Sequence, residues 1–85
     1  MKVRILFFAS LREQLGTSRE EIELPSEVTT VAGLRSHLKS RGGAYETAFA
    51  DKNLVRIAVN QDMVSLVSPI KPGDEVAFFP PVTGG

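Results

Sequence analysis

The chain contains no cysteine and only one histidine among its 85 residues. Without cysteine it can form no disulfide, no thiolate nucleophile and no cysteine-ligated metal site. His37 has no second histidine with which to share a metal ion, so we interpret it as a solvated helix residue rather than a metal ligand or a general base. These absences exclude several common ways of building a reactive centre.

The sequence also lacks an excess of either charge, because ten basic residues balance ten acidic ones. Proteins that bind nucleic acid usually present a basic face, so this balance argues against a nucleic-acid partner. No long hydrophobic run is present either. The apolar start of the chain is short and is interrupted by Arg4, which argues against a signal peptide and a membrane span. We therefore expect a cytoplasmic protein with no membrane partner.

Glycine-rich phosphate loops and dinucleotide fingerprints are missing as well. A domain this short buries only somewhat more than about 60% of the surface of its unfolded chain, which leaves little room for an enclosed pocket. The glutamates Glu20, Glu21 and Glu23 are interpreted as a solvated strand and turn face. The sequence therefore predicts no internal catalytic site, no bound cofactor and no metal site.

What the sequence does contain is alternation of apolar and polar residues in two early segments, which predicts two strands in a hairpin. The inward residues of these strands are Val3, Ile5, Phe7, Ile22 and Leu24. Between the strands, Ser10 and Glu13 have the spacing of a capping box and Gly16 suits a helix C-terminus. We therefore expect one or two helical turns in this connection.

A longer helix is predicted in the middle of the chain, where Val31, Leu34 and Leu38 recur at helical spacing. Thr30 can cap its start and Gly42 can close its end. A further helical turn is expected shortly afterwards, in the sequence YETAFA.

The last third of the chain predicts three more strands. The first two are separated by a turn at Gln61–Asp62, with Val64 and Leu66 facing inward in the second. The third follows a type II turn at Pro72–Gly73.

One main helix and five short strands favour an α+β fold of the ubiquitin-like β-grasp type, in which a mixed five-stranded sheet packs on the helix. The pattern alone also permits other α+β packings. We expect the domain to span residues 1–79 and a flexible tail to span residues 80–85.

Three large apolar side chains are predicted to lie on the solvent side of this sheet. Adjacent residues of a strand point to opposite faces, so Phe79 should face outward if Phe78 faces the core, and Phe8 should face outward after Phe7. Met63 should do the same beside the hairpin turn. Such a patch is typical of a docking site, although the segment around residues 46–50 or the tail could cover it.

The end of the chain is the least expected feature for folding alone. Pro80 and Pro81 keep the backbone extended and cannot donate ladder hydrogen bonds, so pairing should stop there. The six residues that follow Phe79 reach roughly 20 Å when stretched. Gly84 and Gly85 have no side chain that would block a narrow channel. A frayed end is the usual alternative for terminal residues.

Three stretches of the sequence, VRILFFASLREQLG, AVNQDMVS and DEVAFFPPVTGG, resemble the small subunit of molybdopterin synthase, a sulfur carrier with the β-grasp fold. The resemblance covers essentially the whole chain, and FFPPVTGG together with AVNQ is its specific part. A terminal Gly-Gly alone would indicate only the wider ubiquitin-like group.

This resemblance implies a chemistry for Gly85. In the family, an adenylyltransferase similar to ubiquitin-activating enzymes uses ATP to form a glycyl adenylate, and a sulfur donor then displaces AMP to give a thiocarboxylate. The tail enters a pocket of the large subunit and donates sulfur to cyclic pyranopterin monophosphate, which builds the molybdopterin dithiolene. Two small and two large subunits are expected to assemble. The tail residues in this role are Pro80, Pro81, Val82, Thr83, Gly84 and Gly85.

Two other classes stay open at this stage. One is a thiamine-type sulfur carrier or a ubiquitin-like protein modifier, since both also end in Gly-Gly. The other is a plain interaction module whose tail has no function.

Overall fold

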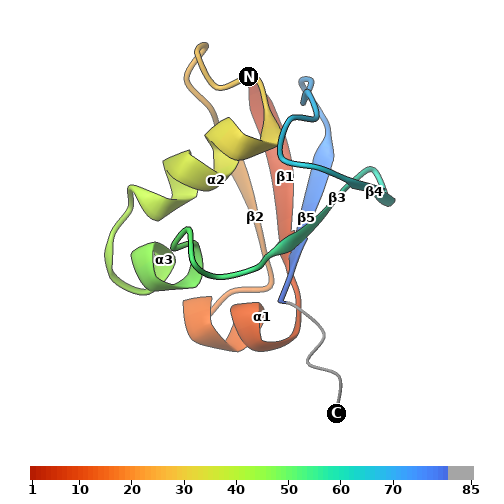
Figure 1. Cartoon of the computed structure of the whole chain (residues 1–85). Helices are drawn as coiled ribbons and strands as arrows, with labels where there is room; N and C mark the ends of the chain where they lie inside the picture. Colours follow the sequence, from red (N-terminus) through yellow and green to blue (C-terminus); the bar gives the residue numbers. More distant parts are fainter. Residues whose placement is uncertain (81–85) are drawn as a thin grey trace.

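The computed structural model describes residues 1–80, and residues 81–85 lie outside the described part (Figure 1). Five strands and three helices are present in this part. In chain order they are β1 Lys2–Phe7, α1 Ala9–Leu15, β2 Arg19–Glu23, α2 Val31–Lys39, α3 Gly43–Ala48, β3 Arg56–Val59, β4 Asp62–Val64 and β5 Glu75–Phe79. Within residues 1–80, no helix is long and apolar enough to cross a membrane.

The five strands form one mixed sheet with the order β2-β1-β5-β3-β4. The central strands β1 and β5 are parallel, whereas the other three neighbouring pairs are antiparallel. The helices lie together on one side of the sheet, and β5 ends beside α1, at the opposite end from Met1 (Figure 1). The predicted β-grasp architecture is confirmed, including the antiparallel pairing of the first two strands.

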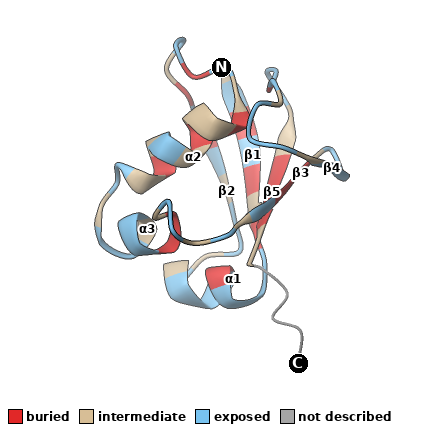
Figure 2. Cartoon of the chain, in the orientation of Figure 1, coloured by how far each residue is buried: buried red, intermediate tan, exposed pale blue. Residues whose placement is uncertain are grey.

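The core lies between the inner face of the sheet and the helices, as Figure 2 shows in red. Strand alternation turns Ile5, Phe7 and Phe78 toward the helices, and helical spacing turns Leu34 and Leu38 toward the sheet; all five are essentially inaccessible to solvent. Burying one such side chain contributes about 1.5–3 kcal/mol. The predicted inward residues of the first two strands are likewise buried.

Helix α1 begins earlier than the capping-box spacing predicts. Phe8 is its N-cap residue, with no side-chain cap, and the N–H of Leu11 donates to the carbonyl of Phe8. Ser10 therefore lies inside the first turn, and the predicted capping box is wrong. Burial of Leu11 against the core accounts for the early start, because it requires the helix to turn directly after β1. The predicted C-terminus is confirmed, since Gly16 adopts a left-handed conformation at φ 74°.

Helix α2 begins as predicted, because the Thr30 side chain accepts a hydrogen bond from the N–H of Gly33 at 3.2 Å. It ends earlier than predicted, with Ser40 as its C-cap. Gly42 instead adopts a φ of 76° directly before α3, which is the predicted further helical turn. The two glycines Gly42 and Gly43 both have positive φ, so the chain reverses there before α3 starts.

Two arginines hold the helical layer in place. The Arg35 guanidinium, on α2, donates to the carbonyls of Phe49, Ala50 and Asn53 at 3.3, 2.8 and 2.7 Å, and so binds the C-terminal end of α3. Arg41 forms a two-pronged ion pair with Glu20 of β2. This hydrogen-bonded pair raises the pKa of Arg41 above its already high ordinary value.

The β3–β4 hairpin differs from the prediction by one residue. Asn60 and Gln61, both with positive φ, form the turn, and Asp62 already pairs with Val59. Two positive φ values are typical of the type I′ turn, whose twist matches that of the strands. The predicted turn at Gln61–Asp62 is therefore wrong.

The strand after this turn is shorter than predicted. It ends at Val64, and the Leu66 side chain is 41% exposed rather than inward-facing. The cause is a backbone bond, since the carbonyl of Leu66 accepts from the N–H of Ala32 in the first turn of α2. The chain leaves the sheet to satisfy this helix terminus. The later turn at Gly73 has the positive φ that the type II prediction requires.

Candidate functional site

The outer face of the sheet, opposite the helices, carries the predicted aromatic residues. The rings of Phe8 and Phe79 stack with centroids 4.7 Å apart and an interplanar angle of 7°. Phe8 is 38% exposed and Phe79 is half-buried. Their chain neighbours Phe7 and Phe78 are buried in the core. Both rings therefore face outward because successive side chains of a strand point to opposite faces of the sheet.

Met63 lies in a neighbouring row of the same face. It pairs with Ala58, which pairs with Ala77, which in turn pairs with Leu6, so the four side chains cross the sheet on one side. Met63 is 55% exposed. The structure thus brings Phe8 and Phe79 into direct contact and places Met63 on the same face.

Sequence reasoning missed Ala58 and Ala77, two apolar residues that, together with Leu6, connect these three side chains. Both alanines stand at outward positions where a solvated strand would carry polar residues, and that was the available signal. Knowing that they adjoin requires the strand order, because β1, β5 and β3 are far apart in the chain.

The segment around residues 46–50 does not cover this face. Phe49 is buried on the helix side, where its ring packs edge-on against Phe78 with centroids 5.1 Å apart. Within the described residues, the aromatic pair therefore stays accessible on the outer face.

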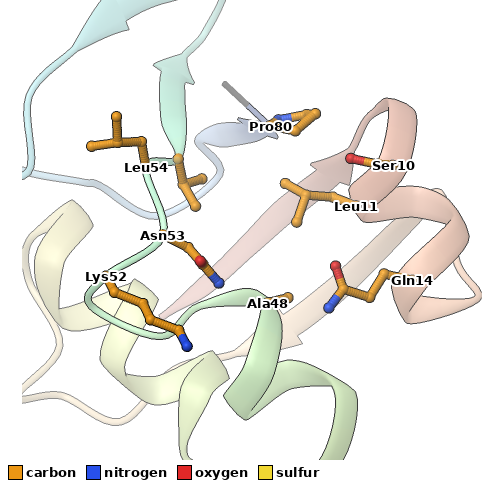
Figure 3. Close-up of a pocket in the computed structure, with 9 residues that line it drawn as sticks. Ser10, Leu11, Gln14, Ala48, Lys52, Asn53, Leu54 and Pro80 are labelled. Carbon is orange, nitrogen blue, oxygen red and sulfur yellow. The ribbon is translucent and has the colours of Figure 1, made fainter. Parts of the chain in front are cut away.

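Pro80, where the predicted tail begins, lines a surface hollow of about 460 Å³ (Figure 3). The hollow lies between α1 and the α3–β3 connection. Its walls are Ser10, Leu11, Gln14, Ala48, Lys52, Asn53, Leu54, Val55 and Pro80. It is open to solvent and contains neither a carboxylate nor a histidine, so it has no acid–base pair of its own.

The histidine considered in the sequence analysis lies away from the outer face. His37 is in the last turn of α2. Among residues 1–80, no group of three or more histidine, aspartate and glutamate side chains is placed to hold a metal ion. The tail residues Pro81, Val82, Thr83, Gly84 and Gly85 lie outside the described residues, so their predicted roles stay predictions.

Comparison with known proteins gives a consistent result. The model of the ThiS family matches residues 5–85. A relative from Escherichia coli, the molybdopterin synthase sulfur carrier subunit, is 45% identical over 83 residues, which cover 98% of this chain and 99% of the relative.

Solved structures agree with the fold. Small archaeal modifier protein 1 of Haloferax volcanii has a TM-score of 0.77 and 26% identity, covering 95% of this chain and 98% of that one. One chain in a complex of subunits 1 and 2 of the molybdopterin-converting factor from Helicobacter pylori has a TM-score of 0.67. Its identity to this chain is 24% over the full length of both chains. A Caldiarchaeum subterraneum ubiquitin has a TM-score of 0.55 at 17% identity, covering 100% and 98% of the two chains. The latter two likenesses show the fold alone.

The family match spans nearly the whole chain, and the match to the bacterial relative covers almost all of both chains. The outer-face aromatic residues and the Gly-Gly end fall within the matched region. The chain therefore belongs to the ThiS family and, within it, to the molybdopterin synthase sulfur carrier subunits.

Proposed function

We propose that the chain carries sulfur as a thiocarboxylate on Gly85 and delivers it within molybdopterin synthase, in the biosynthesis of the molybdenum cofactor. The observation that carries this proposal is the stacked Phe8–Phe79 pair on the outer face. Phe79, one member of the pair, directly precedes Pro80. A protein that covers the pair is therefore also next to the start of the tail. Family membership supports the same function.

The chemistry begins with activation of the carboxylate. A carboxylate is a poor electrophile, so an adenylyltransferase first transfers AMP from ATP to Gly85 and releases pyrophosphate. Sulfide released by a sulfur donor then attacks the acyl carbon and AMP leaves with the bonding electron pair, which gives the thiocarboxylate. Glycine suits this position because it has no side chain beside the reacting carbon.

The second half of the proposal concerns the partner. The chain supplies the reacting sulfur, and the large subunit supplies the pocket that binds cyclic pyranopterin monophosphate. Two transfers from two carriers build the dithiolene, in an assembly of two small and two large subunits. The description of the E. coli relative as a subunit of molybdopterin synthase supports a second subunit.

The proposal gives the chain no resident cofactor, since ATP is bound by the activating enzyme. It places the protein in the cytoplasm, where that enzyme has ATP available. The hollow beside Pro80 lacks a catalytic pair, which supports a pocket on the partner instead.

Deletion of Gly85 tests the proposal. The deletion moves the reacting atom by up to about 3.5 Å, far beyond what a positioned nucleophile tolerates. We expect complete loss of pterin conversion when activating enzyme, ATP, a sulfur source and the large subunit are present. The intact-mass spectrum should show replacement of one oxygen by sulfur in the unaltered chain and not in the variant.

Two further variants complete the test. Gly84→Val should fail in the same assay, because its side chain cannot enter the channel, and one alanine added after Gly85 should fail because of its length. All three variants should keep the melting temperature of the parent. Pterin conversion by the chain that lacks Gly85 would show that the sulfur is carried elsewhere.

A protein modifier is the second candidate, and the likeness to small archaeal modifier protein 1 favours it. In that case Gly85 would form isopeptide bonds with lysines of other proteins. Mass spectrometry of cell extracts for lysines joined through an isopeptide bond to the C-terminal peptide of this chain separates the two functions, since a carrier that acts only in sulfur transfer leaves no such adduct.

A further inference from the structure

The hollow beside Pro80 has a polar side that favours a negative charge. Ser10 and Gln14 of α1 and Lys52 of the α3–β3 connection each bring a group that can donate a hydrogen bond. No carboxylate stands among the residues that line the hollow, and Lys52 is the one cation among them. The polar side is therefore positively charged.

The fold makes no use of these three donors in the part of the chain that the structure describes. All three residues are exposed, and within residues 1–80 their side chains form no hydrogen bond or ion pair. Asp51 precedes Lys52 in the chain, but its carboxylate lies 3.7 Å from Lys39 Nζ. The Lys52 ammonium is therefore available to another anion.

The rest of the hollow is apolar, and this part lies nearer to Pro80. Leu54 belongs to it and is 75% exposed, so an occupant would bury apolar surface there. Figure 3 shows Leu11 and Leu54 toward Pro80, and the ends of Lys52 and Gln14 on the side away from it. A fitting occupant is thus apolar near Pro80 and negatively charged farther on.

The five residues that follow Pro80 have this order of chemistry. Val82 comes early, and the segment ends in the carboxylate of Gly85. A sphere of 460 Å³ is about 10 Å across, whereas five extended residues span up to about 17 Å. The carboxylate can therefore cross the hollow to Lys52, and Gly84 and Gly85 have no side chain to accommodate on the way.

We propose that, in the free chain, residues 81–85 turn back into this hollow, with Val82 against Leu54 and the Gly85 carboxylate bound by Lys52 and Gln14. The length of this segment and the charge complementarity between its end and the hollow carry the inference. The connection through Pro80 keeps the carboxylate near Lys52 at an effective concentration of about millimolar. An exposed ion pair is weak, so a partner that binds the tail can draw it out.

The purpose of this contact rests on the proposed function. It is a resting position that holds the reactive end against the body of the domain until a partner takes it. A thiocarboxylate is also an anion, so it can occupy the same position. Activation and sulfur transfer then begin with release of the tail from Lys52.

Arg56 on the outer face is the competing partner for the carboxylate, because it is exposed and pairs with Phe79. The hollow that adjoins Arg56 has a volume of about 430 Å³, but Pro80 is not part of its lining. Pro80 does line the hollow that contains Lys52, so the tail starts at the wall of that hollow. This difference favours Lys52, and the experiments below separate the two positions.

Nuclear magnetic resonance tests the contact on the isolated, unmodified chain. Removal of residues 81–85 should shift the side-chain amide of Gln14 and the backbone amide of Leu54. Lys52→Gln should move the Gly85 amide signal toward its position in a free peptide of residues 81–85, with a docked population reduced about two- to fivefold. The control Lys71→Gln, an exposed lysine of the β4–β5 connection, should leave that signal in place.

Two results of this measurement would overturn the proposal. One is a chain ending at Pro80 whose hollow signals match those of the parent, since nothing then occupied the hollow. The other is a set of shifts at Phe8 and Arg56 in place of Gln14 and Leu54, which would put the tail on the outer face.

Cross-linking supplies an independent test. A water-soluble carbodiimide activates the Gly85 carboxylate, and the Lys52 amine then attacks the acyl carbon while the activator leaves as a urea. The product is an amide within one chain, lighter than the parent by one water, and peptide mapping locates it. In the matched control, Lys52→Gln combined with Arg56→Lys, the amine stands on the outer face at the same length of tail.

The link at Lys52 in the parent should be several-fold more abundant than the link at position 56 in the control. Equal yields would mean that the tail samples both sides without a preferred position. A greater yield at position 56, or a product of doubled mass, would place the tail on the outer face or on a second copy. Each of these results would overturn the proposal.

These measurements separate the contact from the function. None of them uses sulfur, so failure of sulfur transfer at Gly85 would leave a contact with Lys52 standing. Normal sulfur transfer by a chain that shows no contact at Lys52 would remove the resting position and leave the proposed function intact.

Discussion

The two faces of the sheet each carry a stacked pair of phenylalanine rings, and both pairs come from the same two doublets in the sequence. On the inner face, Phe7 and Phe78 stack with centroids 6.2 Å apart, and Phe49 packs edge-on against Phe78. On the outer face, Phe8 and Phe79 stack with centroids 4.7 Å apart and face solvent. The same residue type in adjacent positions thus stabilises the domain on one face and offers a contact on the other.

The difference arises from the pleat and from what covers each face. Successive side chains of a strand alternate, so each doublet must give one ring to each side. Helices cover the inner rings, whereas no described segment covers the outer pair. The energetic consequence of losing a ring should therefore differ sharply between the faces.

The largest expected effect is on stability, from removing an inner ring. Phe78→Ala should lower the free energy of unfolding by about 3–5 kcal/mol, because it leaves a cavity in the core. Phe79→Ala should cost clearly less, since its ring is only half-buried. Urea denaturation of both variants measures the two values. A greater loss for Phe79→Ala would mean that the faces are assigned the wrong way round.

The next effect is on binding, from changing an outer ring. Phe8→Asp should weaken association with the large subunit by about 2 kcal/mol or more, roughly thirtyfold in Kd, because it places a charge in the apolar centre of the contact. Binding to the activating enzyme should weaken as well. Calorimetric titration gives the Kd values, and a near-parental melting temperature is the control. Normal binding would remove the outer face from the docking surface.

A third effect compares arginines on the two sides. Arg35→Ala should destabilise the domain by about 1.5–3 kcal/mol, because three carbonyls in the segment that follows α3 lose a charged donor. Arg56→Ala, on the outer face, should change stability by less than about 0.5 kcal/mol. Thermal unfolding of the two variants measures both losses, and equal losses would contradict the division between an arginine bonded within the fold and one exposed on the outer face.

The smallest effect concerns pH and lies at the far end of the outer face. A hydrogen bond and the positive charge of the Met1 amino group, 2.9 Å from Glu23 Oε2, lower the pKa of Glu23 below its ordinary value of 4.5. A lowered folded-state pKa stabilises the fold above the ordinary pKa and loses that contribution as the pH falls through the folded value.

The Tm of the Glu23→Gln variant should therefore fall slightly less between about pH 5 and pH 3 than the Tm of the parent. The part of the fall that comes from other titrating groups should change little. Because Glu23 is exposed, only a small difference is expected. Melting curves across this pH interval measure it. An unchanged slope would show that the ion pair contributes nothing in solution.

Local patterns were sufficient to predict much of this structure. Alternation identified the inner residues of β1 and β2, helical spacing identified the buried side of α2, and Thr30 was recognised as its cap because a hydroxyl directly before a helix can satisfy a free N–H. The strand period alone predicted that each of the doublets Phe7–Phe8 and Phe78–Phe79 has one ring facing the core and one ring facing outward. These features depend on interactions between residues close together in the chain.

Errors occurred where distant contacts outweighed a local signal. Leu66 had the strand pattern, but its carbonyl binds the start of α2 and the strand ends early. Ser10 had the capping-box spacing, but α1 turns immediately after β1 so that Leu11 enters the core. In both cases a tertiary contact determined the boundary of an element that local propensity alone placed elsewhere.

The sequence by itself determined which side chains of each strand face the core, because that choice depends only on the two-residue period of the backbone and on where apolar residues fall. It also provided the motifs that indicate the family. Only the tertiary structure decided that Phe8 contacts Phe79, that Arg19 lies beside Leu6 and that Arg56 lies beside Phe79. Those neighbours come from strands β1, β5, β2 and β3, and their order in the sheet is set by the global packing of strands and helices, which no local pattern records.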